Sequence, residues 1–193
     1  MIQTEQVIQE VKKMIKGKDT SICKVFAAML AGGHILIDDV PGVGKTTLAV
    51  AFSQAMQLEN HRVQFTPDVL PADILGFSMY QKETGQFVYY PGAVICNLFL
   101  ADEINRTSPK TQSALLEVME EGCVTVDGVT REMPEPFLVM ATQNPKGSAG
   151  TQLLPESQLD RFMICVSMGY PDVATEIEIA RGKSASEEQE TIS

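Results

Sequence analysis

A short apolar strand followed by a glycine-rich turn and a helix constrains the fold of this chain more than any other feature. Residues 34–38 read HILID, residues 39–44 read DVPGVG, and residues 45–56 have a helical composition. In this order the backbone N–H groups of the turn and the helix N-terminus point at one place, which favours a bound phosphate. Gly42 and Gly44 allow a close backbone approach there. The segment therefore predicts a phosphate-binding loop, in preference to an ordinary turn that ends in a surface lysine.

The loop departs from the usual pattern G-x-x-x-x-G-K-[ST] at its first position, where the chain has Asp39. The tightest approach to phosphate comes later in the loop, so we expect the Asp39 side chain to point away. Lys45 is expected to reach the phosphates as a point charge. The Thr46 hydroxyl is expected to bind Mg²⁺. The predicted nucleotide-binding residues of this loop are Pro41, Gly42, Val43, Gly44, Lys45, Thr46 and Thr47.

A second buried strand, residues 97–103, ends in two acids. Asp102 is expected to support Mg²⁺ through its water shell, and Glu103 to orient or deprotonate the attacking water. Solvated acids at a strand end are the common alternative. The position of the pair after the glycine-rich loop, with one strand between them, favours the catalytic interpretation.

Two further residues are candidates because of the strands beside them. Asn144 follows the apolar residues 137–141, and ligands of open α/β sheets bind at that end of a strand. A turn before Pro145 is the alternative role for this asparagine. Arg161 could simply pair with Asp160, which is the commoner case for a surface arginine. In oligomeric ATPases such an arginine can instead reach the γ-phosphate of a neighbouring subunit.

The alternation of strands and helices predicts an α/β fold, a mostly parallel sheet with helices on both faces and hairpin inserts. We expect one core domain over residues 1–182, including N-terminal helices within 1–33, and a polar, disordered tail over 183–193. The expected helices cover 2–16, 19–31, 45–56, 109–121 and 172–181, with one helical turn within 67–76. The expected strands cover 34–38, 62–65, 97–103, 137–141 and 162–166, and the expected hairpins cover 77–90 and 123–133.

Charge and cysteine usage restrict the partners and the compartment. The formal charge is −10, from 15 basic and 25 acidic side chains, which disfavours binding to nucleic acid or to a membrane surface. The most apolar stretch is shorter than the ~20 residues that a membrane-spanning helix needs. The four cysteines form no C-x-x-C pair, which predicts buried free thiols in the cytoplasm.

The motifs together resemble the MoxR-type AAA+ ATPases over most of residues 7–181. The resemblance rests on the stretches AGGHILIDDVPGVGKTTLA, VQFTPDVLPADILG, LADEINRTSPKTQSALLEVMEEGCVTVDG, FLVMATQNP and LPESQLDRF. It implies ATP and Mg²⁺ as cofactors, with Glu103 as the catalytic acid, Asn144 as the first sensor and Arg161 as an arginine finger acting in trans. It also assigns Gly17 to the adenine pocket.

The resemblance further implies a homo-oligomeric ring, with a hexamer as the expected form, that remodels protein partners such as von Willebrand A-type domains. The inserts at 67–90 and 123–134 are expected to face the pore of the ring. The family normally adds a C-terminal helical lid, and the chain ends at Ser193, so we expect a core without its lid. Two functions stay open: an ATP-hydrolysing chaperone, or a catalytically silent module that binds nucleotide and partner proteins. A small-molecule kinase is disfavoured because the LADEIN segment is not typical of one.

Overall fold

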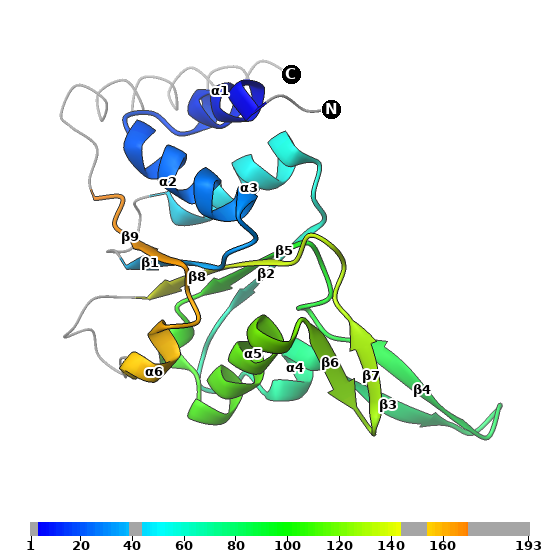
Figure 1. Ribbon diagram of the computed structural model, residues 1–193. Coiled ribbons are helices and arrows are strands. Elements are labelled where there is room, and N and C mark those ends of the chain that lie inside the picture. Colours follow the sequence, from blue (N-terminus) through cyan, green and yellow to red (C-terminus); the bar gives the residue numbers. More distant parts are fainter. Residues whose placement is uncertain (1–3, 39–43, 144–153, 170–193) are drawn as a thin grey trace, which may run out of the picture.

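The structure, a computed structural model, describes residues 4–38, 44–143 and 154–169 and consists of a sheet between two layers of helices (Figure 1). Its helices are α1 (Thr4–Met14), α2 (Asp19–Leu30), α3 (Lys45–Met56), α4 (Pro71–Leu75), α5 (Pro109–Glu121) and α6 (Glu156–Leu159), with a 3₁₀ turn η1 (Ile104–Arg106). The strands are β1 (Ile35–Asp38), β2 (Asn60–Gln64), β3 (Gly76–Gln81), β4 (Gln86–Pro91), β5 (Leu98–Asp102), β6 (Cys123–Val126), β7 (Val129–Glu132), β8 (Leu138–Gln143) and β9 (Ile164–Val166). Within the described residues, no helix has the length and apolarity that crossing a bilayer requires.

The central sheet has five strands in the order β2-β5-β8-β1-β9, and every neighbouring pair is parallel. Leu36 of β1 lies opposite Ala141 of β8, and Val63 of β2 lies opposite Ala101 of β5. The predicted α/β class with a mostly parallel sheet is therefore confirmed. Because all five strands run the same way, their carboxyl ends meet at one edge of the sheet.

Alternate residues of the strands enter two separate apolar cores, one on each face of the sheet. Ile35 and Ile37 of β1 pack against α1, α2 and α3, whereas Leu36 between them packs on the side of α4 and α5. In β5 the same alternation places Leu100 in the first core and Phe99 in the second. Burial on both faces explains why these strands are continuous apolar runs. Figure 1 shows the two helical layers above and below the sheet.

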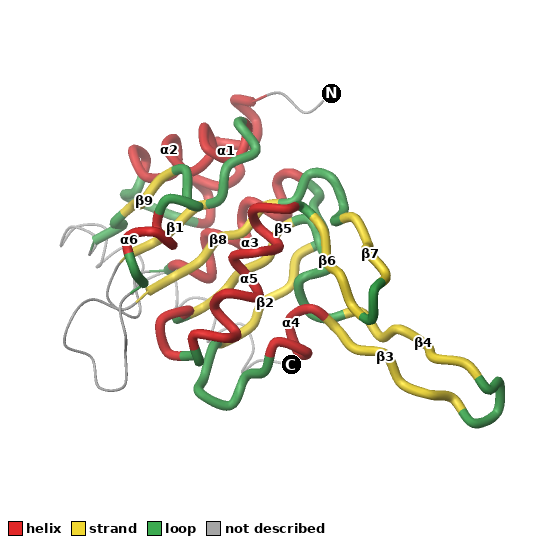
Figure 2. Tube along the Cα trace, turned by 60° about the horizontal axis from the view of Figure 1, so that its bottom comes forward, coloured by secondary structure: helices red, strands yellow, loops and turns green. Residues whose placement is uncertain are grey.

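Two hairpins extend from the lower layer; the sequence predicted a hairpin or a loop for the first and a hairpin for the second. Strands β3 and β4 form an antiparallel ribbon that projects away from the body of the molecule (Figure 2), with β6 and β7 beside its base. The Arg131 guanidinium lies 3.7 Å from the centre of the Tyr89 ring, which joins the two hairpins. The Tyr89 hydroxyl also donates to the Leu75 carbonyl at 2.5 Å, which ties the ribbon to α4.

Most expected elements within the described residues are present, although some of their ends differ and two short elements were not expected. β2 begins at Asn60, two residues earlier than predicted, because its pairing with β5 extends to Leu98. The short elements η1 and α6 were missed because three or four residues are too few for a helical period to be recognised. The expected helix over 172–181 and the expected tail over 183–193 lie outside the described residues.

The cysteines are free thiols, as expected, but they are not uniformly buried. Cys96 is buried, and burial raises its pKa to about 11. Cys23 and Cys165 are exposed, which corrects the expectation of buried thiols. Cys165 is in the three-residue strand β9 at the margin of the sheet, where no further strand covers it within the described part of the chain.

His34, just before β1, is a structural histidine that connects the two central strands with α5. The Val139 N–H donates to His34 Nδ1 at 3.0 Å, so Nε2 carries the proton and donates to the Met119 carbonyl, also at 3.0 Å. The edge of the ring lies against Phe137. The bond from the Val139 N–H needs the neutral imidazole, because a protonated Nδ1 could not accept. Burial lowers the pKa of His34, and the bond to Met119 only partly offsets this effect.

We predict that His34 makes the protein less stable as the pH falls below about 6.5, the ordinary pKa of histidine. The folded state has the lower pKa, so the unfolded chain binds the proton first on acidification. The contribution of His34 is complete above that pH and declines below it, by at most about 1.4 kcal/mol per pH unit. Urea unfolding from pH 8 to pH 5 measures the effect, with His34→Gln as the variant that cannot titrate there. The prediction is refuted if the free energy of unfolding changes equally with pH in the native protein and in His34→Gln.

Candidate nucleotide site

The candidate site lies at the carboxyl edge of the central strands. β1 ends at Asp38, β5 at Asp102 and β8 at Gln143, and Asp38 pairs in register with Gln143. The helix α3 begins at the same edge, directly after the glycine-rich loop. The loop residues Pro41, Gly42 and Val43, together with Asp39 and the predicted sensor Asn144, lie outside the described residues.

The first turn of α3 is shaped by Gly44 and carries the predicted phosphate-binding side chains. Gly44 has a φ of +89°, a left-handed conformation that glycine adopts without a steric penalty. Its carbonyl accepts the Leu48 N–H at 2.9 Å and so opens the helix. Lys45 is buried, Thr46 is half-buried and Thr47 is exposed. The helix N-terminus and its positive potential are thereby positioned at the edge where the strands end.

The Asp102 carboxylate is the centre of the described part of the site. Its side chain is only 8% exposed, and both of its oxygens are engaged. Thr142 Oγ1 donates to Oδ1 at 3.2 Å. Arg62 Nε donates to Oδ2 at 2.7 Å, and Thr46 Oγ1 donates to the same oxygen at 3.4 Å. The structure therefore brings Thr46 and Asp102 together and adds two partners, Arg62 and Thr142.

The donor atoms at this point suit a magnesium ion. The Thr46 hydroxyl and the Asp102 carboxylate are hard oxygen ligands, the type that Mg²⁺ prefers. Thr46 would coordinate directly and Asp102 through water, as Mg²⁺ keeps several of its waters when bound. These two residues fit the predicted cation, and they are the residues that would hold it.

Glu103 occupies a sharp turn between β5 and η1. Its φ of +56° lies in the left-handed region, which costs of order 1 kcal/mol or more for a residue with a side chain. The Glu103 N–H donates to Thr142 Oγ1 at 2.8 Å, and this bond supports the turn. The Glu103 carboxylate accepts from Arg106 Nη1 at 2.7 Å. Thr142 thus links the backbone of Glu103 to the side chain of Asp102.

Two buried acceptor atoms at the same edge have no hydrogen-bond partner within the described ranges. They are Asp38 Oδ1 and Gln143 Oε1, on the two strand ends that pair in register. Buried polar atoms without partners are rare in folded proteins. Their position favours a site whose donors come from water or from a bound molecule.

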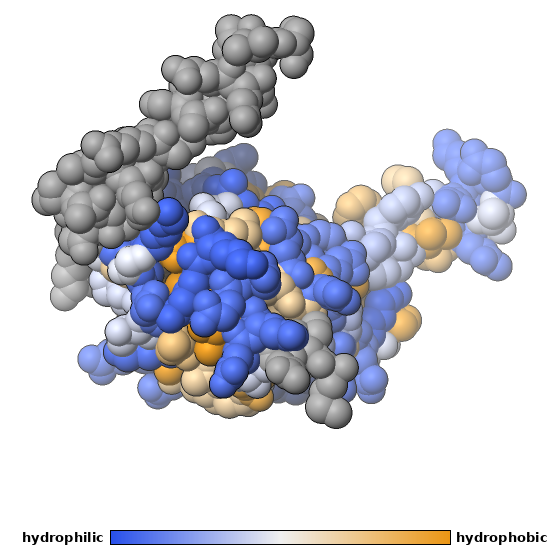
Figure 3. Space-filling view, turned by 90° about the horizontal axis from the view of Figure 1, so that it is seen from above, coloured by the Kyte–Doolittle hydropathy of each residue, from blue (hydrophilic) through white to orange (hydrophobic). Residues whose placement is uncertain are grey.

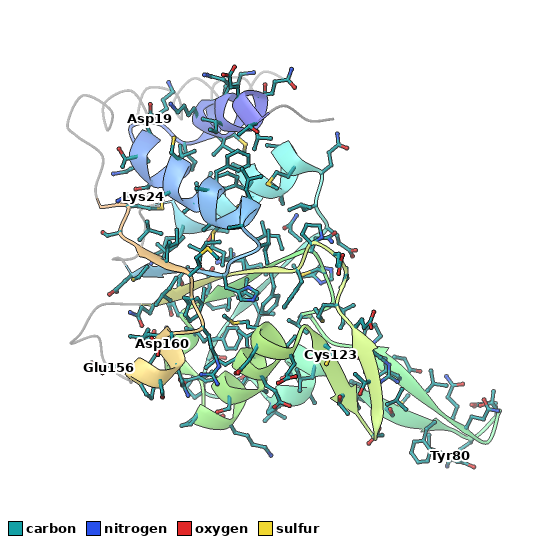
Figure 4. The ribbon with its side chains drawn as sticks, in the orientation of Figure 1. Asp19, Lys24, Tyr80, Cys123, Glu156 and Asp160 are labelled. Carbon is teal, nitrogen blue, oxygen red and sulfur yellow. The ribbon has the colours of Figure 1, made fainter. Side chains whose placement is uncertain are left out.

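Arg161, the predicted finger, lies on the lower side of the sheet at the end of α6. Its guanidinium pairs with the Glu120 carboxylate of α5, at 2.8 Å from Nη2 and 3.1 Å from Nε, and donates to the Ser157 carbonyl at 2.7 Å. The expected alternative was a pair with Asp160, and the acid is Glu120 instead, because α5 packs beside α6. Figure 4 shows α6, with Asp160 labelled, across the sheet from α2.

Gly17, the predicted adenine-pocket residue, lies in the turn between α1 and α2 with a φ of +71°. It borders an open hollow of about 340 Å³ whose lining includes Lys18, Ser21 and Met168. A Cβ atom at Gly44 would lie 3.9 Å from Ile15 Cδ1. The end of α1 therefore adjoins the start of α3, which brings the Gly17 turn near Gly44.

Sequence reasoning missed Arg62, Thr142, Arg106 and Glu120. Thr142 is one polar residue within an apolar strand, and its contact with Asp102 follows only from the pairing of β5 with β8. Arg62 is on β2, which the chain reaches long before β5. No local pattern identifies either residue, since both act through neighbouring strands.

Comparison with known proteins places this site in a family context. The profile of the ATPase family associated with various cellular activities (AAA) matches residues 34–164. The chain is 49% identical over 187 residues to the uncharacterized protein YeaC of Bacillus subtilis, covering 97% of this chain and 58% of YeaC. It is 46% identical over 175 residues to Chaperone MoxR1 of Mycobacterium tuberculosis, covering 91% of this chain and 46% of MoxR1.

A crystal structure of a protein from Cytophaga hutchinsonii is similar in fold as well as in sequence. It superposes with a TM-score of 0.83 at 44% identity, over 93% of this chain and 55% of that protein. The chain spans about half the length of these relatives.

We predict that Thr142→Val destabilises the protein by about 1–3 kcal/mol, the usual cost of leaving a buried polar group unpaired. Valine keeps the shape of threonine but removes the hydroxyl that Asp102 and the Glu103 N–H both use. Thr142→Ser keeps that hydroxyl and should lose much less stability. The free energy of unfolding in urea tests this, and a valine variant as stable as the native protein would show that the link is unimportant.

Proposed function

Because the chain belongs to the ATPase family associated with various cellular activities (AAA), in its MoxR-type branch, we propose that it binds ATP and Mg²⁺ and hydrolyses the γ-phosphate. The observation that carries the proposal is the joint position of Thr46, Asp102 and Glu103 at the edge where α3 begins. A helix N-terminus, a buried acid and a second acid meet there, and P-loop NTPases use such groups to bind phosphate, to hold Mg²⁺ and to orient the attacking water.

In the proposed mechanism each residue has one task. Lys45 and the loop N–H groups of residues 41–44 bind the phosphates. Thr46 and Asp102 hold the cation, which when bound neutralises the phosphate charge. Glu103 orients the attacking water and accepts its proton, and Asn144 contacts the γ-phosphate or that water. Arg106 holds the Glu103 carboxylate in a defined orientation through their 2.7 Å ion pair.

We further propose that the active form is a homo-oligomer in which Arg161 completes the site of a neighbouring subunit. The Arg161 side chain, two residues after the end of α6, is partly exposed, and Glu120 holds it in one orientation. An arginine that is already oriented loses less entropy when it binds a phosphate across an interface. A lone arginine finger can accelerate phosphoryl transfer strongly.

The proposed substrates are other proteins, in keeping with the resemblance and with the printed description of MoxR1 as a chaperone. The β3–β4 ribbon carries exposed apolar side chains, and Phe87 is 74% exposed. Figure 3 shows such apolar atoms on the projecting part of the molecule. The exposed residues are Phe77, Met79, Tyr80, Phe87 and Tyr90. A ribbon of this kind supports contact with a protein partner.

We predict that Glu103→Gln retains ATP binding and lowers the hydrolysis rate by about 10²–10⁴-fold, the usual contribution of a general base. Lys45→Ala should instead weaken ATP binding. Phosphate release at saturating Mg²⁺ measures turnover, and a fluorescent ATP analogue measures binding. Sustained turnover by the Glu103→Gln variant would contradict the assignment. ATP binding without turnover in the native chain would support the silent module.

A mixing experiment tests the proposed role of Arg161 in trans. Arg161→Ala and Glu103→Gln should each be inactive alone, and their mixture should recover part of the native rate. In mixed oligomers some sites combine an intact Glu103 with an intact Arg161 from the neighbour. A mixture of Glu103→Gln with Lys45→Ala is the control, because both residues act within one subunit and no complete site can form. Absence of recovery in the first mixture would refute action in trans.

A further inference from the structure

We propose that Arg62 is a positioning residue of the cation site: it is the built-in counter-ion of Asp102, and it competes with a divalent cation for Oδ2. Arg62 thereby sets how strongly nucleotide binding depends on Mg²⁺. The inference rests on the proposed function, since it concerns the same acid.

The geometry of Asp102 divides its two oxygens between different tasks. Oδ1 accepts the Thr142 hydroxyl at 3.2 Å, a bond within the sheet. Oδ2 faces Thr46 at 3.4 Å and is therefore the oxygen directed toward the proposed cation. Arg62 Nε contacts this same oxygen at 2.7 Å. The guanidinium and a hydrated cation held between Thr46 and Asp102 would thus compete for one atom.

Burial explains why Asp102 needs a positive partner. Its side chain is 8% exposed, and an isolated buried carboxylate carries a large desolvation penalty. Arg62 supplies the compensating charge and a short, charge-assisted hydrogen bond.

The position of Arg62 explains how it can leave. β2 is one of the two edge strands of the described sheet, and the Arg62 side chain is 52% exposed. Water can solvate the guanidinium as soon as it separates from Asp102, so the main cost of its departure is the uncompensated charge of Asp102, which an incoming cation would offset. A buried anion paired with a half-exposed cation is an arrangement in which the cation can be exchanged for another one.

The test compares nucleotide affinity with and without Mg²⁺. The affinity of a fluorescent ATP analogue is measured in excess EDTA and in excess Mg²⁺ for the native chain and for Arg62→Gln. Without Arg62 the uncompensated Asp102 should repel the phosphates in EDTA, and with Mg²⁺ no guanidinium has to be displaced. The affinity in Mg²⁺ divided by the affinity in EDTA should therefore increase by about two- to fivefold, the range expected for an ion pair with one exposed partner.

Three matched variants separate this role from a general effect on folding or charge. Lys82→Gln removes the same charge at the exposed tip of the β3–β4 ribbon and should leave the ratio unchanged. Arg62→Lys keeps the charge and should retain most of the native ratio. In an Asp102→Asn background, Arg62→Gln should have no further effect on the ratio. Urea unfolding of each variant establishes that it is folded.

The outcomes are distinct. If Arg62→Gln has the same affinity ratio as the native chain, the inference is overturned. The same holds if Arg62→Gln still changes the ratio in the Asp102→Asn background. Either result leaves the proposed function intact. Failure of the native chain to bind the analogue in either condition would overturn the proposed function, and the inference with it. A widened ratio that depends on Asp102 would establish Arg62 as the counter-ion.

Discussion

Parallel pairing of the five central strands is the constraint on which the rest of this molecule depends. Such a sheet buries both faces, so it needs two helical layers and produces two apolar cores. Pairing in one direction also brings the polar ends of β1, β5 and β8 to a single edge. The site is a direct consequence, because Asp102 and Thr142 come from different strands and meet only there.

Arginine–carboxylate pairs then determine the electrostatics of the site and its surroundings. Arg62 pairs with Asp102, Arg106 with Glu103, and Arg161 with Glu120. The three pairs differ in burial, and the Asp102 carboxylate is the most buried of the three acids. Since desolvation increases both the attraction between charges and the cost of separating them, we expect this pair to affect ligand binding most.

The β3–β4 ribbon contrasts with the rigid sheet. A two-stranded ribbon on its own is marginally stable in water. Here it is fixed at its base by the Tyr89 contacts with Leu75 and Arg131, while its far end carries exposed aromatic side chains. This division separates the place where chemistry is proposed to occur from the surface proposed to meet a partner.

The sequence by itself determined the elements whose signals are local. The bounds of α3 and α5, the hairpin with Gly85 at its tip, and the acids at the end of β5 all follow from periodicity, turn residues and strand composition. The prediction that the loop 39–44 binds phosphate likewise rests on a contiguous strand, glycine-rich turn and helix. The tertiary structure alone decided that Arg62 and Thr142 contact Asp102, and that Glu120 holds Arg161. These contacts join residues from separate elements, and they exist only because strand order and helix packing bring those elements together.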